Sequence, residues 1–268
     1  MTFPFDITIN LDQSNIAGVQ NRTIKINGGI TTFLGPNGSG KTQLLRGLKR
    51  SLNSHLNEKK IRYISAGRLG PMENFRSDYD GQRGMPRFEN ATFGDKTATS
   101  RRHQTETILG DFATLSERPD ILIKVQERLR KLFKRDIIID WDGGNLKVFF
   151  ARVDQENTSN YSSAREASGL LHLVAMLSAL YDDEVGCLLI DEPEVSLHPQ
   201  LQSFLLSEII KVAGANTEQG KKLIFISTHS TEFIELSSVE QLSCIVFCKD
   251  ILTDPVQIDP NLEEFKGK

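Results

Sequence analysis

The stretch Gly35-Pro36-Asn37-Gly38-Ser39-Gly40-Lys41-Thr42 decides the fold of this 268-residue chain, because it matches G-x-x-x-x-G-K-[ST] at every fixed position. Its glycines let backbone N–H groups approach phosphate oxygens, and the N-terminus of a following helix favours negative charge. Lys41 neutralises the outer phosphates, and Thr42 supplies a hydroxyl for Mg²⁺. The eight residues predict a site for a nucleoside triphosphate, namely ATP with Mg²⁺, rather than a chance glycine turn.

The segments around this loop supply the strand and the helix that such a loop requires. Ile30–Leu34 is typical of a buried strand, and residues 43–52 place their leucines on one helical face. Upstream, apolar and polar residues alternate over residues 5–11, and residues 23–26 lead into an Asn-Gly-Gly turn. The N-terminal part is therefore predicted to be β-rich and to form a β-meander.

Composition and length bound the class of protein. With 38% apolar residues the chain can bury a sizeable core, and we expect one domain over residues 1–268. A net charge of −3 gives no global reason to expect nucleic acid or an anionic membrane as a partner. No apolar run reaches the ~18 residues of a membrane span, and residues 1–6 do not have the basic and apolar pattern that we would expect of a signal peptide. We expect a soluble, cytoplasmic protein without a membrane partner.

The three cysteines, Cys187, Cys244 and Cys248, all lie in apolar runs, and their odd number argues against a disulfide framework. No His or Cys pair lies nearby at ligand spacing, so we interpret them as reduced core residues rather than metal ligands.

The middle of the chain has a different pattern. Residues 70–107 are rich in polar residues and glycine without apolar periodicity, which indicates a long loop. Residues 118–135 form an amphipathic helix with a basic outer face, and residues 137–150 form a β-hairpin around a Gly-Gly turn. We expect residues 70–160 to be an inserted arm. Its basic helix, or Arg101-Arg102, could contact DNA, RNA or a protein, although such a face is usually solvated.

The C-terminal half alternates short buried strands with helices, which predicts a mainly parallel sheet and an α/β fold. One apolar run, Cys187-Leu188-Leu189-Ile190, ends in Asp191-Glu192. We assign Asp191 to the metal and Glu192 to the general base, because one carboxylate can hold Mg²⁺ and the other can polarise the attacking water. A solvated acidic turn before Pro193 is the alternative.

A histidine follows another predicted strand of this sheet. His229 comes after residues 223–228, at the carboxyl edge where open α/β sheets bind ligands. Contact with the γ-phosphate is the functional hypothesis. The alternative is a histidine that only satisfies the local structure.

Three segments together resemble ABC-type ATPases. Residues 35–42, 187–198 and 225–230 are similar to the Walker A motif, the Walker B motif with its D-loop, and the H-loop of that superfamily. The form Asp-Glu-Pro-Glu-x-x-Leu-His-Pro most resembles the SMC-like and OLD-like branch. The resemblance spans nearly the whole chain and implies an ABC-type P-loop α/β fold, Mg²⁺-dependent ATP hydrolysis, and a homodimer that encloses two ATP molecules.

The same resemblance implies further site residues. Its signature serine lies about two dozen residues before the Walker B aspartate, which points to Ser168 and Gly169, and Ser168 would also cap its helix. His198 should lie near the dimer interface without being catalytic. The Leu-Ser-Gly-Gly-Gln signature of transporter ATPases is absent, which disfavours a transporter subunit. Arg68 and Gln82 are weak Q-loop candidates, and no adenine-contacting residue is assigned.

The chain has neither the long coiled coils of SMC proteins nor the nuclease domain of OLD-type proteins, so we expect a separate protein effector. By family analogy this effector is DNA-acting, for example a nuclease in genome maintenance or antiviral defence against phage. The alternative is an ATP-dependent sensing or scaffolding module with little turnover. A transporter ATPase is the third hypothesis.

Overall fold

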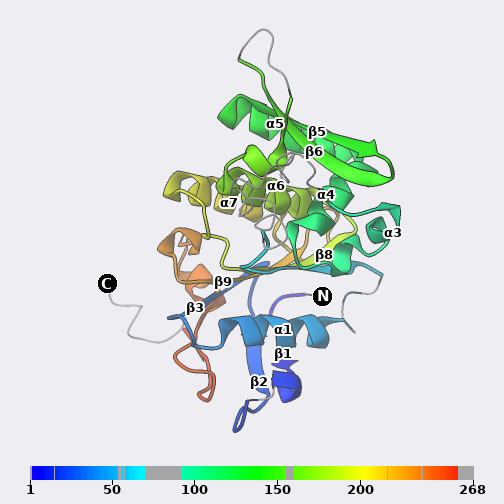
Figure 1. Cartoon of the computed structure of the whole chain (residues 1–268). Coiled ribbons are helices and arrows are strands. Elements are labelled where there is room, and N and C mark those ends of the chain that lie inside the picture. The colour runs from blue at the N-terminus through cyan, green and yellow to red at the C-terminus, as the bar shows by residue number, and fades with distance from the viewer. Residues whose placement is uncertain are drawn as a thin grey trace. The chain divides into compact units, whose positions relative to one another are not determined.

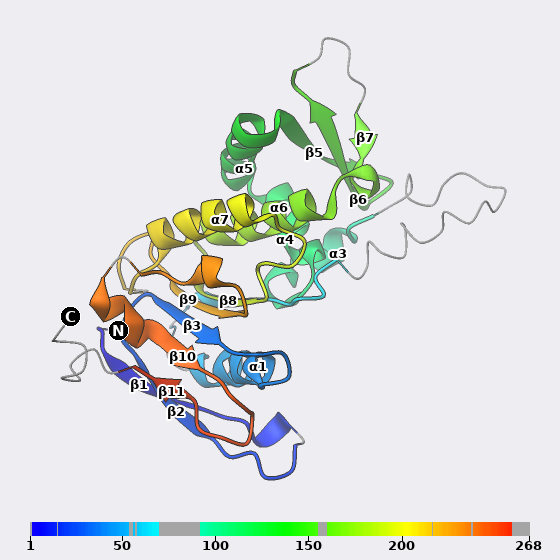
Figure 2. The ribbon, with the colours of Figure 1, turned by 90° about the vertical axis from the view of Figure 1, so that its left-hand side faces the viewer.

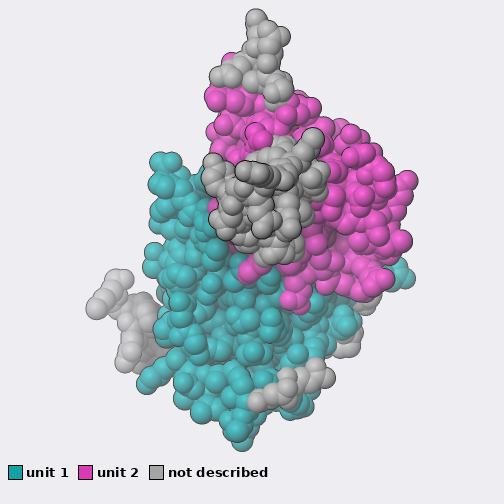
Figure 3. Space-filling view, in the orientation of Figure 1, with its two compact units in different colours: residues 1–66, 183–268 teal, residues 67–182 magenta. Residues whose placement is uncertain are grey.

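The computed structural model describes residues 2–14, 16–53, 56, 58–69, 92–154, 160–215, 217–236 and 238–258. The chain divides into two compact units (Figure 3). Unit 1 comprises residues 1–66 and 183–268, and unit 2 comprises residues 67–182. The predicted insertion, residues 70–160, falls within unit 2.

The main sheet of unit 1 is mixed and mostly parallel, as the sequence predicts. Its described strands lie in the order β11 (Val256–Gln257), β10 (Ile245–Phe247), β3 (Ile30–Leu34), β9 (Leu223–Thr228), β8 (Val185–Asp191) and β4 (Lys60–Ile64). All neighbours are parallel except the antiparallel pair of β10 and β11. Every residue of β8 and β9 is buried, which explains their unbroken apolar runs.

The N-terminal part is β-rich, but the predicted meander is wrong beyond its first hairpin. β1 (Phe5–Ile9) and β2 (Arg22–Ile26) pair antiparallel in a separate two-stranded sheet, whereas β3 joins the main sheet. Helix α1 (Lys41–Leu52) lies between the two sheets (Figure 2). One apolar cluster joins all three layers, with members Ile9, Ile26, Leu45, Leu48, Phe33 and Phe225.

The register of the parallel strands aligns their carboxyl ends. Asp191 at the end of β8 lies opposite Ser227 of β9, and Leu34 at the end of β3 lies opposite Thr228. The loop after β3, the turn after β8 and the residues after β9 therefore start at one edge of the sheet. Helix α7 (Pro199–Val212) lies on the side of the sheet opposite α1 (Figure 2).

Unit 2 is built from helices and a small antiparallel sheet. Its described α-helices are α3 (Lys96–Thr99), α4 (Ile108–Glu117), α5 (Pro119–Phe133) and α6 (Ser168–Tyr181). The sheet consists of β5 (Arg135–Asp142), β6 (Asn145–Arg152) and β7 (Tyr161–Ser162), with α5 packed against β5 (Figure 1). The predicted amphipathic helix and the hairpin around Gly143-Gly144 are both confirmed.

Two local predictions for this unit need correction. Of the predicted loop over residues 70–107, residues 70–91 lie outside the described residues, and the remainder contains α3 and the short 3₁₀ helix Arg102–Gln104. Asp95 caps α3 by accepting from the backbone N–H groups of Thr97 and Ala98. Ser168 is not the N-cap of α6, because Ala167 occupies that position and Ser168 is the first helical residue.

The three cysteines are free and buried, as predicted. Burial raises the pKa of all three thiols, and for Cys248 the value is about 11. They therefore stay protonated and unreactive at neutral pH. Within the described ranges, no helix is both long and apolar enough to cross a membrane.

Candidate nucleotide-binding site

The glycine-rich loop between β3 and α1 has the conformation that its sequence predicts. Gly38 and Gly40 have φ angles of 82° and 88°, in the left-handed region that favours glycine. Lys41 is buried, and its Nζ donates to the carbonyl oxygens of Gly35 and Pro36 at 2.8 and 2.9 Å. The ammonium group is thus held inside the curve of the loop, where phosphate oxygens would replace the carbonyls as its partners.

An open hollow of about 270 Å³ adjoins the loop. Asn37, Gly38, Gly40, Lys41, Thr42 and Gln43 line it together with Ile16, Glu192 and Ile251. A Cβ atom added to Gly38 would meet no atom within 4 Å, so this part of the loop faces open space. The loop therefore offers its backbone and one buried cation to a ligand in the hollow, which fits the triphosphate of ATP.

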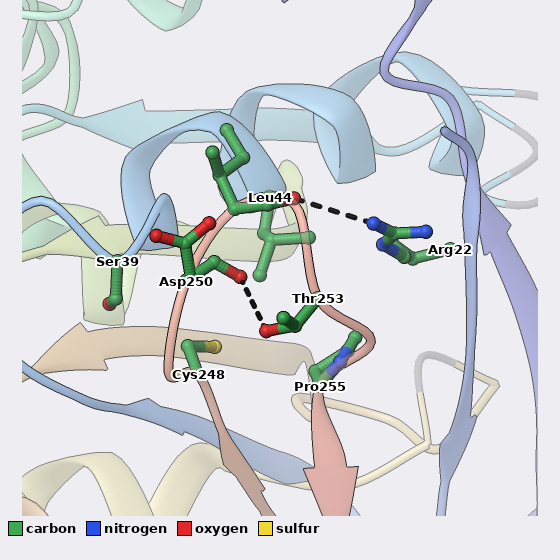
Figure 4. A pocket seen from close by; sticks show the side chains of 8 residues that line it. Arg22, Ser39, Leu44, Cys248, Asp250, Thr253 and Pro255 are labelled. Carbon is green, nitrogen blue, oxygen red and sulfur yellow. Dashed lines mark hydrogen bonds between the residues drawn. The ribbon is translucent and has the colours of Figure 1, made fainter. Parts of the chain in front are cut away.

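The segment 248–255 supports the loop from behind. A Cβ atom on Gly35 would lie 2.1 Å from the carbonyl oxygen of Cys248, so the two backbones can approach this closely only with glycine at position 35. A cavity of about 10 Å³ between the loop and this segment is lined by Ser39 and Cys248, among others (Figure 4). It is about the size of one water molecule, so this side of the loop is packing and not a nucleotide site.

Asp191 and Thr42 meet at the other side of the loop. The Thr42 hydroxyl donates to Asp191 Oδ2 at 2.8 Å, and Asp191 is buried. Tyr63 OH donates to the same oxygen at 3.1 Å, and the Ser227 hydroxyl donates to Oδ1. A hydroxyl beside a carboxylate oxygen is a set of hard donors that fits Mg²⁺. Tyr63 and Ser227 then orient the carboxylate from behind.

Removing the Tyr63 hydroxyl tests this support. Tyr63→Phe keeps the buried ring but deletes a hydrogen bond to a charged group, worth ~1.5–3 kcal/mol. Since groups behind a metal ligand typically contribute 10–100-fold to metal affinity or activity, we expect the Mg²⁺ midpoint of ATP hydrolysis to rise about tenfold. Tyr181→Phe removes the same atom from α6 and is the control. An unchanged midpoint in Tyr63→Phe would refute this role.

Glu192 follows Asp191 and lines the hollow. Its φ angle is 49°, unusual for a residue other than glycine, and its N–H donates to Ser227 O at 2.9 Å. The tight turn directs the chain away from β8 directly after the buried aspartate. This places one carboxylate in the protein interior and the next one at the hollow.

The two histidines near this edge differ in their surroundings. The side chain of His229 is 51% exposed, and its Nδ1 lies 3.0 Å from Glu194 Oε1. His198 is the N-cap of α7, with Nδ1 accepting from the Gln200 N–H at 3.4 Å. His198 thus has a local structural contact, whereas His229 presents much of its ring to solvent.

The remaining predicted residues fall outside unit 1 or outside the described residues. Ser168 and Gly169 begin α6 of unit 2, where no side chain caps the helix. Arg68 is completely buried, and its carbonyl accepts from the Ile108 N–H at 3.1 Å. Gln82 is not among the described residues.

Several residues at the site were missed by sequence reasoning. Ile16 and Ile251 form an apolar part of the hollow's wall, and Ile251 packs closely on Gly40. Nothing in the sequence marks them, because each lies in a short connection without apolar periodicity. Tyr63 lies one residue before the carboxyl end of β4, a strand of the main sheet, and this position could have singled it out.

The sequence matches one protein family. The model described as "AAA domain, putative AbiEii toxin, Type IV TA system" matches residues 85–235, which is more than half of the chain and includes Asp191, Glu192 and His229. No curated protein matches the chain significantly.

Solved structures resemble the fold over nearly the whole chain. An SMC head, solved bound to the C-winged helix domain of ScpA, has a TM-score of 0.52 at 12% identity and covers 98% of this chain and 99% of its own. A dimeric bacterial ABC transporter cassette has a TM-score of 0.44 at 13% identity, covering 96% and 98%. An ATP-binding subunit of an ABC transporter has 0.44 at 14%, covering 99% and 94%. At these identities the SMC head shows a shared fold alone.

The matching family model, the fold shared with the SMC head and the altered signature at residues 167–171 agree with the resemblance seen in the sequence. The chain belongs to this AAA domain family and is an ABC-type P-loop ATPase, an enzyme that hydrolyses ATP and not a transporter subunit.

Proposed function

We propose that this ATPase uses Mg²⁺ and that ATP brings two copies together to control a separate effector in the cytoplasm. The observation that carries the proposal is the meeting of Thr42 and Asp191 at 2.8 Å, with Glu192 at the hollow beside them. A hydroxyl, a metal-binding carboxylate and a second carboxylate are the groups that nucleotide hydrolysis requires. They lie at one edge of the sheet, next to Lys41.

Each residue has a distinct role in the proposed reaction. Mg²⁺, when bound by Thr42 and Asp191, would offset charge on the phosphates. Lys41 binds the outer phosphates, and Glu192 accepts the proton of the attacking water. His229 contacts the γ-phosphate through the exposed part of its ring. Residues 35–42 hold the triphosphate by their backbone N–H groups.

The dimer completes the site in this proposal. The hollow is open, and among the residues that the structure describes Lys41 is the only cation lining it, so the described part of unit 1 leaves much of a bound γ-phosphate uncovered. Ser168 and Gly169 of a second copy would supply the uncapped first turn of α6 as the opposing contact. Binding then closes the dimer, and hydrolysis opens it.

Sedimentation velocity tests the dimer. We expect Glu192→Gln with excess ATP to sediment as a dimer and the nucleotide-free protein as a monomer. Ser168→Arg places a bulky side chain at the opposing surface, so it should prevent dimerisation and reduce kcat by at least about tenfold. Its ATP affinity should stay within about threefold of wild type, because the hollow belongs to unit 1.

Ser100→Arg is the control, because it introduces the same side chain at an exposed position after α3. A protein that stays monomeric in every nucleotide state, including Glu192→Gln with ATP, would rule out the switch.

The effector is proposed to be a separate protein that acts on DNA, as in genome maintenance or antiviral defence. Two findings support a protein partner, whereas the action on DNA rests on family analogy alone. The family description names a type IV toxin–antitoxin system, and the SMC head with a similar fold was solved with a domain of another protein bound. Both describe relatives, and the extension to this chain is our proposal.

The outer face of α5 is the surface we propose for DNA. Lys124 and Lys131 are exposed on it. Two further basic residues have partners within unit 2: Arg128 Nε donates to Tyr181 OH at 3.3 Å, and Arg130 pairs with Asp136 at 2.6 Å. The two lysines are therefore the residues to change, since altering either arginine would also remove a contact within unit 2.

Charge reversal at both lysines tests this surface. Lys124→Glu with Lys131→Glu should weaken DNA binding, and the salt slope of log K should fall by about 2, because each lost phosphate contact removes about 0.9. Lys25→Glu with Lys60→Glu changes the net charge equally at exposed positions of unit 1 and is the control. If both double variants bind DNA with the same affinity and the same salt slope, the outer face of α5 is an ordinary solvated surface and does not bind DNA.

A further inference from the structure

Glu194 makes one hydrogen bond and one close ion-pair contact to the same residue. Its Oε1 accepts from the backbone N–H of His229 at 2.9 Å and lies 3.0 Å from His229 Nδ1. The Glu194 side chain is only 7% exposed, whereas that of His229 is 51% exposed. A buried carboxylate thus holds both the backbone and the ring of a histidine whose far side remains accessible.

The turn that carries Glu194 also carries Glu192. Within it, Val195 N donates to Glu192 O at 3.2 Å and Leu197 N donates to Glu194 O at 3.0 Å. The turn contains two residues with positive φ, Glu192 at 49° and Ser196 at 62°. One short segment therefore directs one carboxylate to the hollow and another to the histidine of the neighbouring strand.

The segment after β9 is anchored independently from α7. The Ser230 hydroxyl donates to Gln202 Oε1 at 2.8 Å, and the Ser203 hydroxyl donates to Glu232 Oε2 at 2.8 Å. These bonds do not involve Glu194. A change at Glu194 should therefore leave this segment in place, so that its effect on the His229 ring can be measured separately.

The remaining oxygen of Glu194 argues against a purely structural role. Oε2 is buried and has no hydrogen-bond partner in the part of the chain that the structure describes. Burying a carboxylate with one oxygen unsatisfied costs free energy, and a glutamine would avoid part of that cost. A carboxylate at this buried position therefore indicates a function that requires a side chain that only accepts hydrogen bonds.

We propose that Glu194 is a positioning residue that fixes hydrogen on Nδ1 of His229 and thereby presents Nε2 to the γ-phosphate side of the site. A carboxylate oxygen only accepts hydrogen bonds, and at 3.0 Å from Nδ1 it favours the tautomer with hydrogen on that nitrogen. The other ring nitrogen is then left for the ligand. The proposal rests on the proposed function, in which His229 contacts the γ-phosphate.

Glu194→Gln tests the proposal because it keeps the size of the side chain. The amide oxygen can still accept from the His229 N–H, but the amide can also rotate and donate to Nδ1, so control of the ring is lost. We expect kcat to fall about 10–100-fold with KM for ATP within about threefold, taking the effect measured for carboxylates that orient metal-binding histidines as the guide. Glu218→Gln, the same change at an exposed position in another connection of unit 1, is the control and should change neither constant.

A second measurement is independent of activity. In protein labelled with ¹⁵N-histidine, the two-bond ¹H–¹⁵N spectrum distinguishes a neutral ring protonated on Nδ1 from one protonated on Nε2. Of the 5 histidines, the signal of His229 is the one lost in His229→Gln. We expect hydrogen on Nδ1 in the nucleotide-free wild type and a shift towards Nε2 in Glu194→Gln.

The outcomes separate two kinds of failure. A wild-type His229 ring with hydrogen on Nε2, or a Glu194→Gln kcat within threefold of wild type while His229→Gln is impaired, overturns the role of Glu194 alone. A His229→Gln enzyme with unchanged kcat overturns the proposed role of His229 itself, and the catalytic part of the inference falls with it.

Discussion

Replacing Lys41 with methionine is expected to lower ATP affinity by at least about 100-fold. The ammonium group is buried inside the loop, where two loop carbonyls hold it at 2.8 and 2.9 Å, and it is the only cation among the described residues that line the hollow. Charge-assisted hydrogen bonds contribute ~1.5–3 kcal/mol each, so losing two of them to phosphate corresponds to a 10²–10⁴-fold change. Calorimetric titration with ATP measures the loss directly.

The control for this experiment is Arg46→Met. Arg46 lies on α1 as Lys41 does, but it is exposed and does not line the hollow. The variant removes the same charge from the same helix and should bind ATP as wild type does. Thermal unfolding provides a second test: ATP should raise the Tm of wild type and Arg46→Met but not that of Lys41→Met. If Lys41→Met binds ATP within threefold of wild type, the hollow is not the triphosphate site.

Replacing Glu192 with glutamine is expected to reduce kcat by about 10²–10⁴-fold while ATP binding is retained. A general base contributes this much, and an amide cannot accept the proton of the attacking water. Glutamine has nearly the same shape and meets the same backbone strain at a φ angle of 49°, so the turn and its bond to Ser227 should persist. Phosphate release gives the rate, and nucleotide titration gives the affinity.

Glu218→Gln is the matched control, because Glu218 is exposed in a connection of unit 1 away from the hollow. It should release phosphate at the wild-type rate. Equal, trace rates in wild type and Glu192→Gln would instead favour an ATP-dependent sensing or scaffolding module over a switch driven by turnover. Because Glu192→Gln should bind ATP without hydrolysing it quickly, its ATP-bound dimer should persist long enough to be measured by sedimentation.

Local sequence patterns predicted a helix, strand or loop correctly where the residues that determine it all lie within one short segment. The loop at residues 35–42, the buried run of β8 and the amphipathic helix α5 carry their own glycines, apolar runs or periodicity. The loop conformation follows from Gly38 and Gly40, which occupy the left-handed region as the motif requires.

Patterns failed where two conformations fit the same residues. The strand signals of β1, β2 and β3 are alike, yet β3 pairs with β9 and β10, because partner choice depends on distant strands. Ser168 has the residue type of an N-cap, but α6 begins one residue earlier than that assignment requires. Polar residues 92–107 gave no periodic signal although short helices form there, one of them through the cap at Asp95.

The sequence by itself determined that a phosphate-binding loop, a strand ending in two carboxylates and a strand ending in a histidine occur in one chain. The tertiary structure alone decided which side chains hold these groups. Tyr63 and Ser227 lie 128 and 36 positions from Asp191, and Glu194 lies 35 positions from His229. The physical reason is that the register of parallel strands, set by burial of entire strands, brings distant side chains to one edge, whereas periodicity and glycine signals act only within a segment.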